Sequence, residues 1–278
     1  MKYLLQVIAA TILIVVGRYF LSDELRPEFV GNGLGMFVLL FTVELVYDAY
    51  TNWHRLWLVI RCWWLGLFGG HVRFSMSYLY RIKVNDKYLL VKNSNWDHYQ
   101  LVGGKYKRLA LTQKILNDFD AIDDLQMPTN GLKKDDLAVF VPAKNAIKFI
   151  DWFNTGKDRE VSHWREFYEE LIDGKGKLLD QKAFSYVNYN FRKTVCTPLK
   201  RASNWDCWEI LQYDILDFVP NAEQEKRMEE LFQKGDSDYV KWADVSLIQS
   251  LGFDGRQAKT IYKIGQHTKW AINLKWSK

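Results

Sequence analysis

Apolar residues dominate the first seventy positions of the chain, where they form two long runs. The first run covers residues 4–21, and only Gln6, Gly17 and Arg18 interrupt it. The second run covers residues 29–47 and follows a short polar connector that contains a proline. About 20 mostly apolar residues are enough for a helix to cross a bilayer. This pattern predicts a pair of transmembrane helices at the amino terminus.

Three features of this region allow more than one interpretation. A signal peptide is the alternative for the first run, but the run is longer than a usual signal core and no small-residue cleavage site follows it. Glu44 either faces a partner helix or water within the second span, or the helix ends near Thr42 and the acid is interfacial. Residues 53–68 mix tryptophans with Arg61, which favours a helix lying in the membrane interface over a third span.

The distribution of charge predicts an orientation for these helices. Basic residues follow the second run, whereas the connector between the two runs is mainly acidic. By the positive-inside bias, both termini and the large following domain should be cytoplasmic. We therefore divide the chain into a transmembrane and juxtamembrane region, residues 1–70, and a cytoplasmic domain, residues 71–278.

The second region alternates between strand-like and helix-like patterns. Residues 72–84 and 88–92 are rich in β-branched and aromatic side chains on either side of Asn85-Asp86, which indicates a hairpin. Residues 105–157 are irregular and are interpreted as an insertion. The fold class is therefore α+β, a mixed α/β/α sandwich that follows the transmembrane pair. Further strand-like and then helix-like runs are found at residues 184–198, 205–219, 222–234, 242–251 and 258–270.

A short helix within this domain gathers three carboxylates. Glu166, Glu169 and Glu170 project together from one side of it, and repel each other by roughly a few tenths of a kcal/mol per pair. A divalent cation such as Mg²⁺ binds carboxylate oxygens and would relieve this repulsion. On spacing alone, a solvated helix face with Arg165 as counter-charge is the simpler interpretation. The apolar residues that define the opposite, buried side are Val161, Trp164, Phe167, Tyr168, Leu171 and Ile172.

Composition narrows the classes of partner. The 278 residues include 12 Trp, 15 Tyr and 16 Phe, an aromatic content that suits both membrane interfaces and pockets that stack bases. The net charge of +5 favours an anionic ligand or a lipid surface, but it does not argue for DNA as a partner. Cys62, Cys196 and Cys207 show no metal-ligand spacing, so we interpret them as reduced thiols of a cytosolic domain.

The stretch from Arg165 to Glu170, Arg-Glu-Phe-Tyr-Glu-Glu, resembles the core of the Nudix box. In that family the glutamates bind Mg²⁺ against a nucleoside diphosphate. The Gly103-Gly104 pair, which we expect to form a turn beside the helix, is similar to the glycines that precede the box. Asp151 and Lys157 stand where the family has a glycine and a glutamate, and Ile172 stands where it has a second glycine. These departures weaken the expectation of hydrolysis more than the expectation of the fold.

The layout of the whole chain resembles the two-transmembrane NUDIX effectors associated with CD-NTases in bacterial CBASS antiphage systems. The resemblance implies that the cytoplasmic domain senses a cyclic nucleotide second messenger made by the CD-NTase. It further implies that the transmembrane part then disrupts the bacterial inner membrane, with homo-oligomerisation on activation and membrane lipid as a second partner.

A phosphodiester ligand needs cations or backbone N–H donors for its phosphates and flat faces for its bases. Gly103 and Gly104 can bring main-chain N–H groups close to an anion. The aromatic candidates for base stacking are Trp96, Tyr99 and Tyr189. The cationic candidates for ligand binding are Lys105, Arg159, Arg165 and Arg192. The candidate metal ligands are Glu166, Glu169 and Glu170, with Mg²⁺ as the candidate cofactor.

Two functions of different classes remain open from the sequence. The first is a sensor that binds its nucleotide without turnover. The second is a membrane-tethered Nudix hydrolase, in which Mg²⁺ polarises a phosphate and activates water. The missing upstream glutamate favours the sensor. A membrane adaptor that binds proteins through its aromatic surface is a weaker third interpretation, because it leaves the three glutamates unused.

Overall fold

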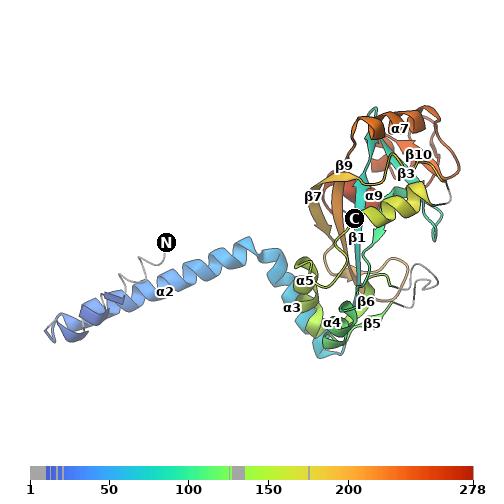
Figure 1. The fold of residues 1–278 in the computed structure, drawn as a ribbon. Helices are drawn as coiled ribbons and strands as arrows, with labels where there is room; N and C mark the ends of the chain where they lie inside the picture. Colours follow the sequence, from blue (N-terminus) through green and yellow to red (C-terminus); the bar gives the residue numbers. More distant parts are fainter. Residues whose placement is uncertain are drawn as a thin grey trace. The chain divides into compact units, whose positions relative to one another are not determined.

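The computed structural model describes residues 11–12, 14–16, 18–20, 22–124, 126, 135–174 and 176–277. The chain separates into two compact units, Met1–Arg61 and Cys62–Lys278, and each is described by itself. The first unit contains helix α2 (Arg26–Thr51) and the beginning of α3 (Trp53–Leu67). The second unit contains the sheet and the helices that pack on it (Figure 1).

The predicted pair of transmembrane helices is wrong. Among the residues that the structure describes, no helix has both the length and the apolar character that crossing a membrane requires. Helix α2 has 26 residues, but Asn32, Glu44 and Asp48 interrupt its apolar sequence. Helix α3 has 15 residues, which is shorter than a span of about 20, so it is not a third span. Much of the first predicted span, residues 4–21, lies outside the described residues.

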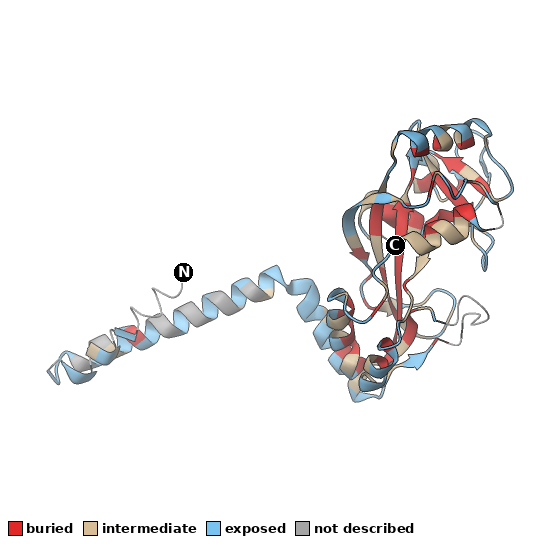
Figure 2. Ribbon diagram, in the orientation of Figure 1, coloured by how far each residue is buried: buried red, intermediate tan, exposed pale blue. Residues whose placement is uncertain are grey.

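The predicted location is corrected with the spans. Placement in the bacterial inner membrane, with the large domain in the cytoplasm, depends on helices that cross a bilayer. Within the described ranges such a helix is not found, and the positive-inside argument therefore has no span on which to act. Many of the described α2 residues are exposed (Figure 2).

The second unit is built on one sheet with strand β1 (His71–Arg81) at its centre. The helices of this unit are α4 (Thr112–Asp118), η2 (Ala143–Asn145), α5 (Ala146–Asn154), α6 (Trp164–Phe167), the π-helical turn η3 (Tyr168–Ile172), α7 (Ala222–Gln233), α8 (Val245–Gln249) and α9 (Gln266–Asn273). The other strands are β2 (Lys83–Val84), β3 (Lys87–Lys92), β4 (Tyr99–Lys105), β5 (Ile122–Asp123), β6 (Ala138–Pro142), β7 (Asn188–Cys196), β8 (Lys200–Arg201), β9 (Trp208–Val219), β10 (Val240–Ala243) and the separate pair β11 (Phe253–Asp254) and β12 (Lys259–Thr260).

Strand β1 pairs with three other strands along its length. β6 runs antiparallel to its first half and β4 antiparallel to its second half. β9 runs parallel to it throughout, from Val72 beside Trp208 to Arg81 beside Asp217. β7 extends the sheet beyond β9, and β3 and β10 extend it beyond β4. The segment interpreted as an insertion, residues 105–157, thus contributes β6 to the sheet.

Both faces of β1 are buried, as a strand at the centre of a covered sheet requires (Figure 2). Side chains alternate between the two faces with a period of two residues. Tyr78 and Tyr80 lie on one face, which we name the tyrosine face, and Leu79 lies on the other, which we name the leucine face. On the tyrosine face, the carboxylate segment formed by α6 and η3 packs through Phe167, whose ring contacts Tyr80 with 5.7 Å between centroids.

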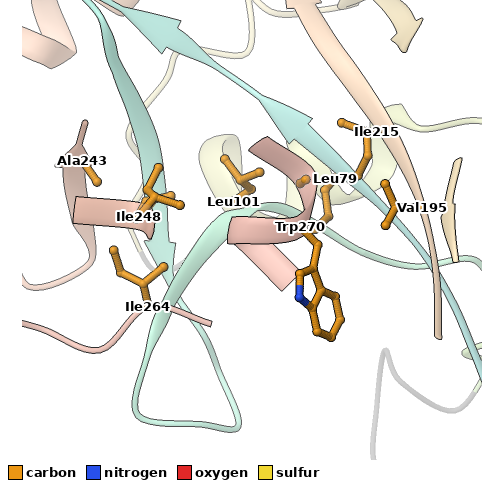
Figure 3. Close-up of a cluster of buried hydrophobic side chains, with 10 residues drawn as sticks. Leu79, Leu101, Val195, Ile215, Ala243, Ile248, Ile264 and Trp270 are labelled. Carbon is orange, nitrogen blue, oxygen red and sulfur yellow. The ribbon is translucent and has the colours of Figure 1, made fainter. Parts of the chain in front are cut away.

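The leucine face carries a hydrophobic cluster that includes helix α9 (Figure 3). Leu79 packs there with Leu101 of β4, Ile215 of β9 and Trp270 of α9, and all four are at most 5 % exposed. Full burial of such a side chain contributes about 1.5–3 kcal/mol. These four residues therefore join three strands and the last helix on the side of the sheet opposite the carboxylate segment.

Several predicted elements are confirmed. Asn85 and Asp86, with φ of 45° and 63°, link β2 to β3 as the hairpin prediction requires. The predicted strand runs 184–198 and 205–219 contain β7 and β9, and the helix expected at 222–234 is α7. The helix expected at 242–251 begins later, because β10 continues through Ala243 and the Asp244 side chain then caps α8 by accepting the Leu247 N–H.

We predict acid sensitivity from His267, which lies at the start of α9. Burial, with a smaller contribution from neighbouring His98, lowers the pKa of His267 to about 3. Its Nε2 lies 3.1 Å from Gln100 Oε1, and its ring stacks on Tyr213. Because the unfolded chain takes up this proton first, the contribution to stability is complete above pH ~6.5 and is lost as pH falls toward 3. His267→Phe should therefore flatten the fall of unfolding free energy with pH over this interval.

Urea denaturation at a series of pH values measures this slope. The control is the same change at exposed His71, which should leave the slope of the wild type intact. An identical slope in His267→Phe and wild type would contradict the assignment.

Candidate functional site

The candidate site forms where the carboxylate segment meets the last residues of β4. β3 pairs with β4 at Tyr99, Gln100 and Leu101, and further along β4 the carboxylate segment lies against the strand. Gly103 and Gly104 are therefore part of a strand and not of a turn, which corrects the sequence interpretation. The structure does bring them beside the glutamates, as expected.

Both glycines are required by close contacts. Gly103 has a φ of +144°, and a Cβ there would lie 2.1 Å from the carbonyl oxygen of Tyr78. Its N–H donates to Glu170 Oε2 at 2.8 Å. A Cβ on Gly104 would lie 2.3 Å from the carboxylate carbon of Glu166. The absence of a side chain thus lets Gly103 pack against the backbone of β1, and at Gly104 it leaves room for the Glu166 carboxylate.

Arg165 connects the carboxylates to one another and to β4. Its Nη1 donates to Glu166 Oε1 at 2.7 Å and to Glu169 Oε2 at 3.1 Å. Its Nε and Nη2 donate to the two oxygens of Glu160 at 3.0 and 3.2 Å, and Nη2 also donates to the carbonyl oxygen of Lys105 at 2.7 Å. One guanidinium therefore binds three carboxylates and one backbone carbonyl.

Two of the glutamates, Glu166 and Glu170, are partly buried, and this changes their acidity. Burial raises the pKa of Glu166 to about 7, against the opposing effect of the Arg165 charge. Burial also raises the pKa of Glu170 well above its usual range, and the nearby Glu166 adds to the effect. The N–H of Gly103 acts in the opposite direction, because it stabilises the charged form of Glu170.

The site also contains two partly buried lysines, Lys105 and Lys107, which both lie close to Asp136. Asp136 Oδ1 lies 2.6 Å from Lys107 Nζ, and Asp136 Oδ2 lies 3.7 Å from Lys105 Nζ. The backbone N–H of Lys107 donates to Glu160 Oε2 at 2.8 Å. Sequence reasoning named Lys105 but missed Lys107, Asp136 and Glu160, because none of the three belongs to a recognisable motif.

The structure separates two predicted ligand residues from this group. The Arg159 guanidinium is buried over the rings of Phe153 and Tyr106, at 3.9 and 4.6 Å from their centroids, and donates to two backbone carbonyls. Arg192 lies on β7, where its Nε contacts Asp217 at 2.7 Å. The structure brings together seven of the predicted residues, Gly103, Gly104, Lys105, Arg165, Glu166, Glu169 and Glu170.

The predicted aromatic residues also have partners within the protein. The Tyr99 hydroxyl donates to the carbonyl oxygen of Asp238, and Trp96 contacts Trp205 edge-on. Tyr189 contacts His163. These contacts place the three rings at different parts of the domain, away from a common stacking surface with the glutamates.

The carboxylates have the right chemistry for Mg²⁺, but their arrangement does not fit the ion. Within the described ranges, no three acidic, histidine or cysteine side chains converge so that they could hold a metal. Arg165 binds one oxygen each of Glu166 and Glu169, and Gly103 binds Glu170. NUDIX domains commonly use Mg²⁺ or another divalent ion. Here Arg165 would compete with such an ion for one oxygen each of Glu166 and Glu169.

We predict that the two glycines differ in their effect on stability. Gly103→Ala should lower the unfolding free energy by roughly 2–4 kcal/mol, because the strained backbone and the contact with Tyr78 add together. Gly104→Ala should cost less, because the Glu166 side chain can move. Chemical denaturation measures both. Gly235→Ala is the matched control, since φ is also positive there but nothing lies within 4 Å; an equal loss at Gly103 and Gly235 would contradict the contact argument.

We also predict that Glu170→Gln stabilises the fold at alkaline pH. The pKa of Glu170 is raised in the folded state, so its stabilising effect is complete below the usual glutamate pKa and is lost as pH rises. Glutamine resembles the neutral acid and still accepts the N–H of Gly103. The melting temperature of the variant should therefore exceed that of the wild type at pH 8.5, with a smaller difference at pH 5. An unchanged difference between the two pH values would contradict this.

Comparison with known families agrees with the geometry. A family model described as the SMODS-associated NUDIX domain matches residues 71–272, which include the sheet, the carboxylate segment and both glycines. The SMODS association suggests the context of a CBASS-type effector. Neither the curated proteins nor the solved structures gave a match. Because the match covers well over half of the 278 residues, the chain belongs to the SMODS-associated NUDIX domain family.

Proposed function

We propose that the NUDIX domain of this chain is a sensor that binds a cyclic nucleotide without rapid turnover. The family match supports a role in CBASS-type antiphage defence. The cyclic nucleotide made by a CD-NTase is the ligand that the sequence resemblance implies. Self-association on activation stays a prediction of the same resemblance.

The engagement of Arg165 is the observation that carries this proposal. A Nudix hydrolase binds its metal ion through carboxylate oxygens, and here Arg165 competes for them, because it binds both oxygens of Glu160 and one oxygen each of Glu166 and Glu169. Removal of a partner from such a partly buried network costs about 1–3 kcal/mol. The network therefore resists conversion into a metal site, and binding is favoured over hydrolysis.

The two lysines of the site, Lys105 and Lys107, suit the phosphates of such a ligand. Lys105 and Lys107 both lie close to the carboxylate of Asp136, so a phosphate that approaches them competes with this acid for the two cations. Both lysines are about 15 % exposed, which makes charge-assisted hydrogen bonds stronger than at an open surface. We infer that this pair is the phosphate contact.

The excess of carboxylates favours one alternative function. Five acids surround the three cations of the site, and an anionic nucleotide would be helped by a divalent cation in such surroundings. The alternative is therefore a Mg²⁺-dependent Nudix hydrolase of a nucleoside diphosphate derivative. The acids are Asp136, Glu160, Glu166, Glu169 and Glu170, and the cations are Lys105, Lys107 and Arg165.

Calorimetry of the full chain against a panel of cyclic di- and trinucleotides tests the sensor. We expect one of them to bind, with Lys107→Ala weakening the affinity by about tenfold, equivalent to about 1.4 kcal/mol. Arg192→Ala is the control, because Arg192 is paired with Asp217 on β7 and should leave the affinity unchanged. A folded chain that binds no member of the panel would remove the proposal.

Turnover is read in the same samples. The bound nucleotide is incubated with the protein and Mg²⁺, and chromatography then shows whether cleaved product forms. The sensor predicts intact nucleotide. Rapid cleavage that is abolished in Glu169→Gln would establish the hydrolase in its place. Light scattering before and after addition of the nucleotide tests the predicted self-association.

A further inference from the structure

Five side chains form a continuous hydrogen-bonded chain on the tyrosine face of the sheet. Tyr189 Oη lies 2.9 Å from His163 Nδ1, and His163 Nε2 lies 2.7 Å from Tyr106 Oη. Tyr106 Oη donates to Asp214 Oδ2 at 2.6 Å. The other oxygen of Asp214 accepts from Thr194 Oγ1 at 2.5 Å. This hydrogen-bonded chain joins strand β7 to strand β9 through His163, which directly precedes α6, and Tyr106, which directly follows β4.

The direction of each hydrogen bond in this chain follows from elementary chemistry. A carboxylate only accepts, so the one hydroxyl hydrogen of Tyr106 is committed to Asp214. The oxygen of Tyr106 must therefore accept from His163 Nε2–H. In a neutral imidazole the other nitrogen then carries a lone pair, and His163 Nδ1 accepts from the hydroxyl of Tyr189. The contacts thus select one tautomer of His163.

Protonation of His163 changes this arrangement. An imidazolium donates from both nitrogens, so Nδ1 would present a hydrogen to Tyr189 where it now accepts one. The Tyr189 hydroxyl would have to rotate so that its oxygen accepts this hydrogen, and its own hydrogen would then lose Nδ1 as its acceptor. A second buried hydroxyl, that of Tyr80, has no partner within the described residues, and its ring contacts that of Tyr189.

The surroundings of His163 keep it neutral. Burial lowers its pKa, and the charge of Arg159 acts in the same direction. Asp214 and Glu160 oppose this effect. The titratable groups that face the ring are Asp214 from β9, Tyr189 from β7, Tyr78 from β1, Tyr106 from the residue after β4, and Arg159 and Glu160 from the segment before α6.

The hydrogen-bonded chain contacts the first turn of the carboxylate segment through His163. His163 directly precedes Trp164, the first residue of α6. Its ring contacts the ring of Tyr78 edge-on, with 4.8 Å between centroids, and Tyr78 Oη accepts the backbone N–H of Glu166 at 3.2 Å. The imidazole therefore lies between the sheet and the turn that carries Arg165 and Glu166.

We propose that His163 is a positioning residue, which holds the start of the carboxylate segment against the sheet as its neutral Nε2–H tautomer and releases it when a proton is taken up. The effect on nucleotide binding rests on the proposed function. The effect on the segment itself does not, because it concerns only contacts within the domain.

Nitrogen-15 NMR of the full chain, labelled at histidine, tests the tautomer. His163 is assigned by the loss of its signals in His163→Gln. At pH 7.5 we expect a protonated Nε2 and an unprotonated Nδ1. In Tyr189→Phe the donor to Nδ1 is absent, so His163 should titrate about 0.5–1 pH unit higher than in wild type. Tyr186→Phe is the control, because Tyr186 is exposed and does not belong to the hydrogen-bonded chain of His163. The opposite tautomer, or an unchanged titration in Tyr189→Phe, overturns the proposal.

Hydrogen exchange of the Glu166 amide tests the positioning role. In wild type its exchange should accelerate as pH falls through the midpoint of His163, beyond the intrinsic dependence of exchange on pH. In Tyr189→Phe the exchange should be faster at neutral pH. An amide that does not follow His163 contradicts the proposal, even if Tyr189→Phe fails to fold, since the wild-type titration is sufficient. Nucleotide affinity should fall across the same midpoint; failure of all nucleotides to bind removes the proposed function and leaves the exchange result intact.

Discussion

The site depends on one guanidinium that satisfies four oxygen-bearing partners at once. Arg165 binds Glu160, Glu166 and Glu169, and it also binds the carbonyl of Lys105, so it attaches the carboxylate segment to β4. Without it, several carboxylates would lie close together in a partly buried site, where uncompensated charge costs several kcal/mol. A metal ion could supply the same compensation, and in this chain Arg165 supplies part of it.

The carboxylate segment is fixed at both of its ends. At its start, His163 and Tyr78 hold the first turn against β1, and further along, the Gly103 amide binds Glu170. Such double attachment is useful in a sensor, because a ligand that disturbs one attachment acts on a rigid segment and not on a loop.

The sequence revealed the parts of the site that belong to a local pattern. The spacing of Phe167 and Leu171 identifies the helical segment, and the glycine pair identifies the place where a backbone is approached closely. Glu160 and Asp136 were not predicted, because their roles depend on contacts between segments that no periodicity describes. The transmembrane prediction was drawn from the length of the apolar runs, whereas no helix within the described residues is both long and apolar enough to cross a membrane.

The parallel pairing of β1 with β9 has a consequence for biosynthesis. Arg73 and Glu209 bind each other across this pair although they are 136 positions apart in the chain. β9 also supplies Asp214, which accepts a hydrogen bond from Tyr106, and Phe218, whose ring contacts Phe167 of the carboxylate segment. On the ribosome, the first strand of the domain is complete long before its parallel neighbour exists, and one edge of β1 must remain unpaired for that whole interval. The native pairing of β1 with β9 therefore forms only after translation has passed residue 219.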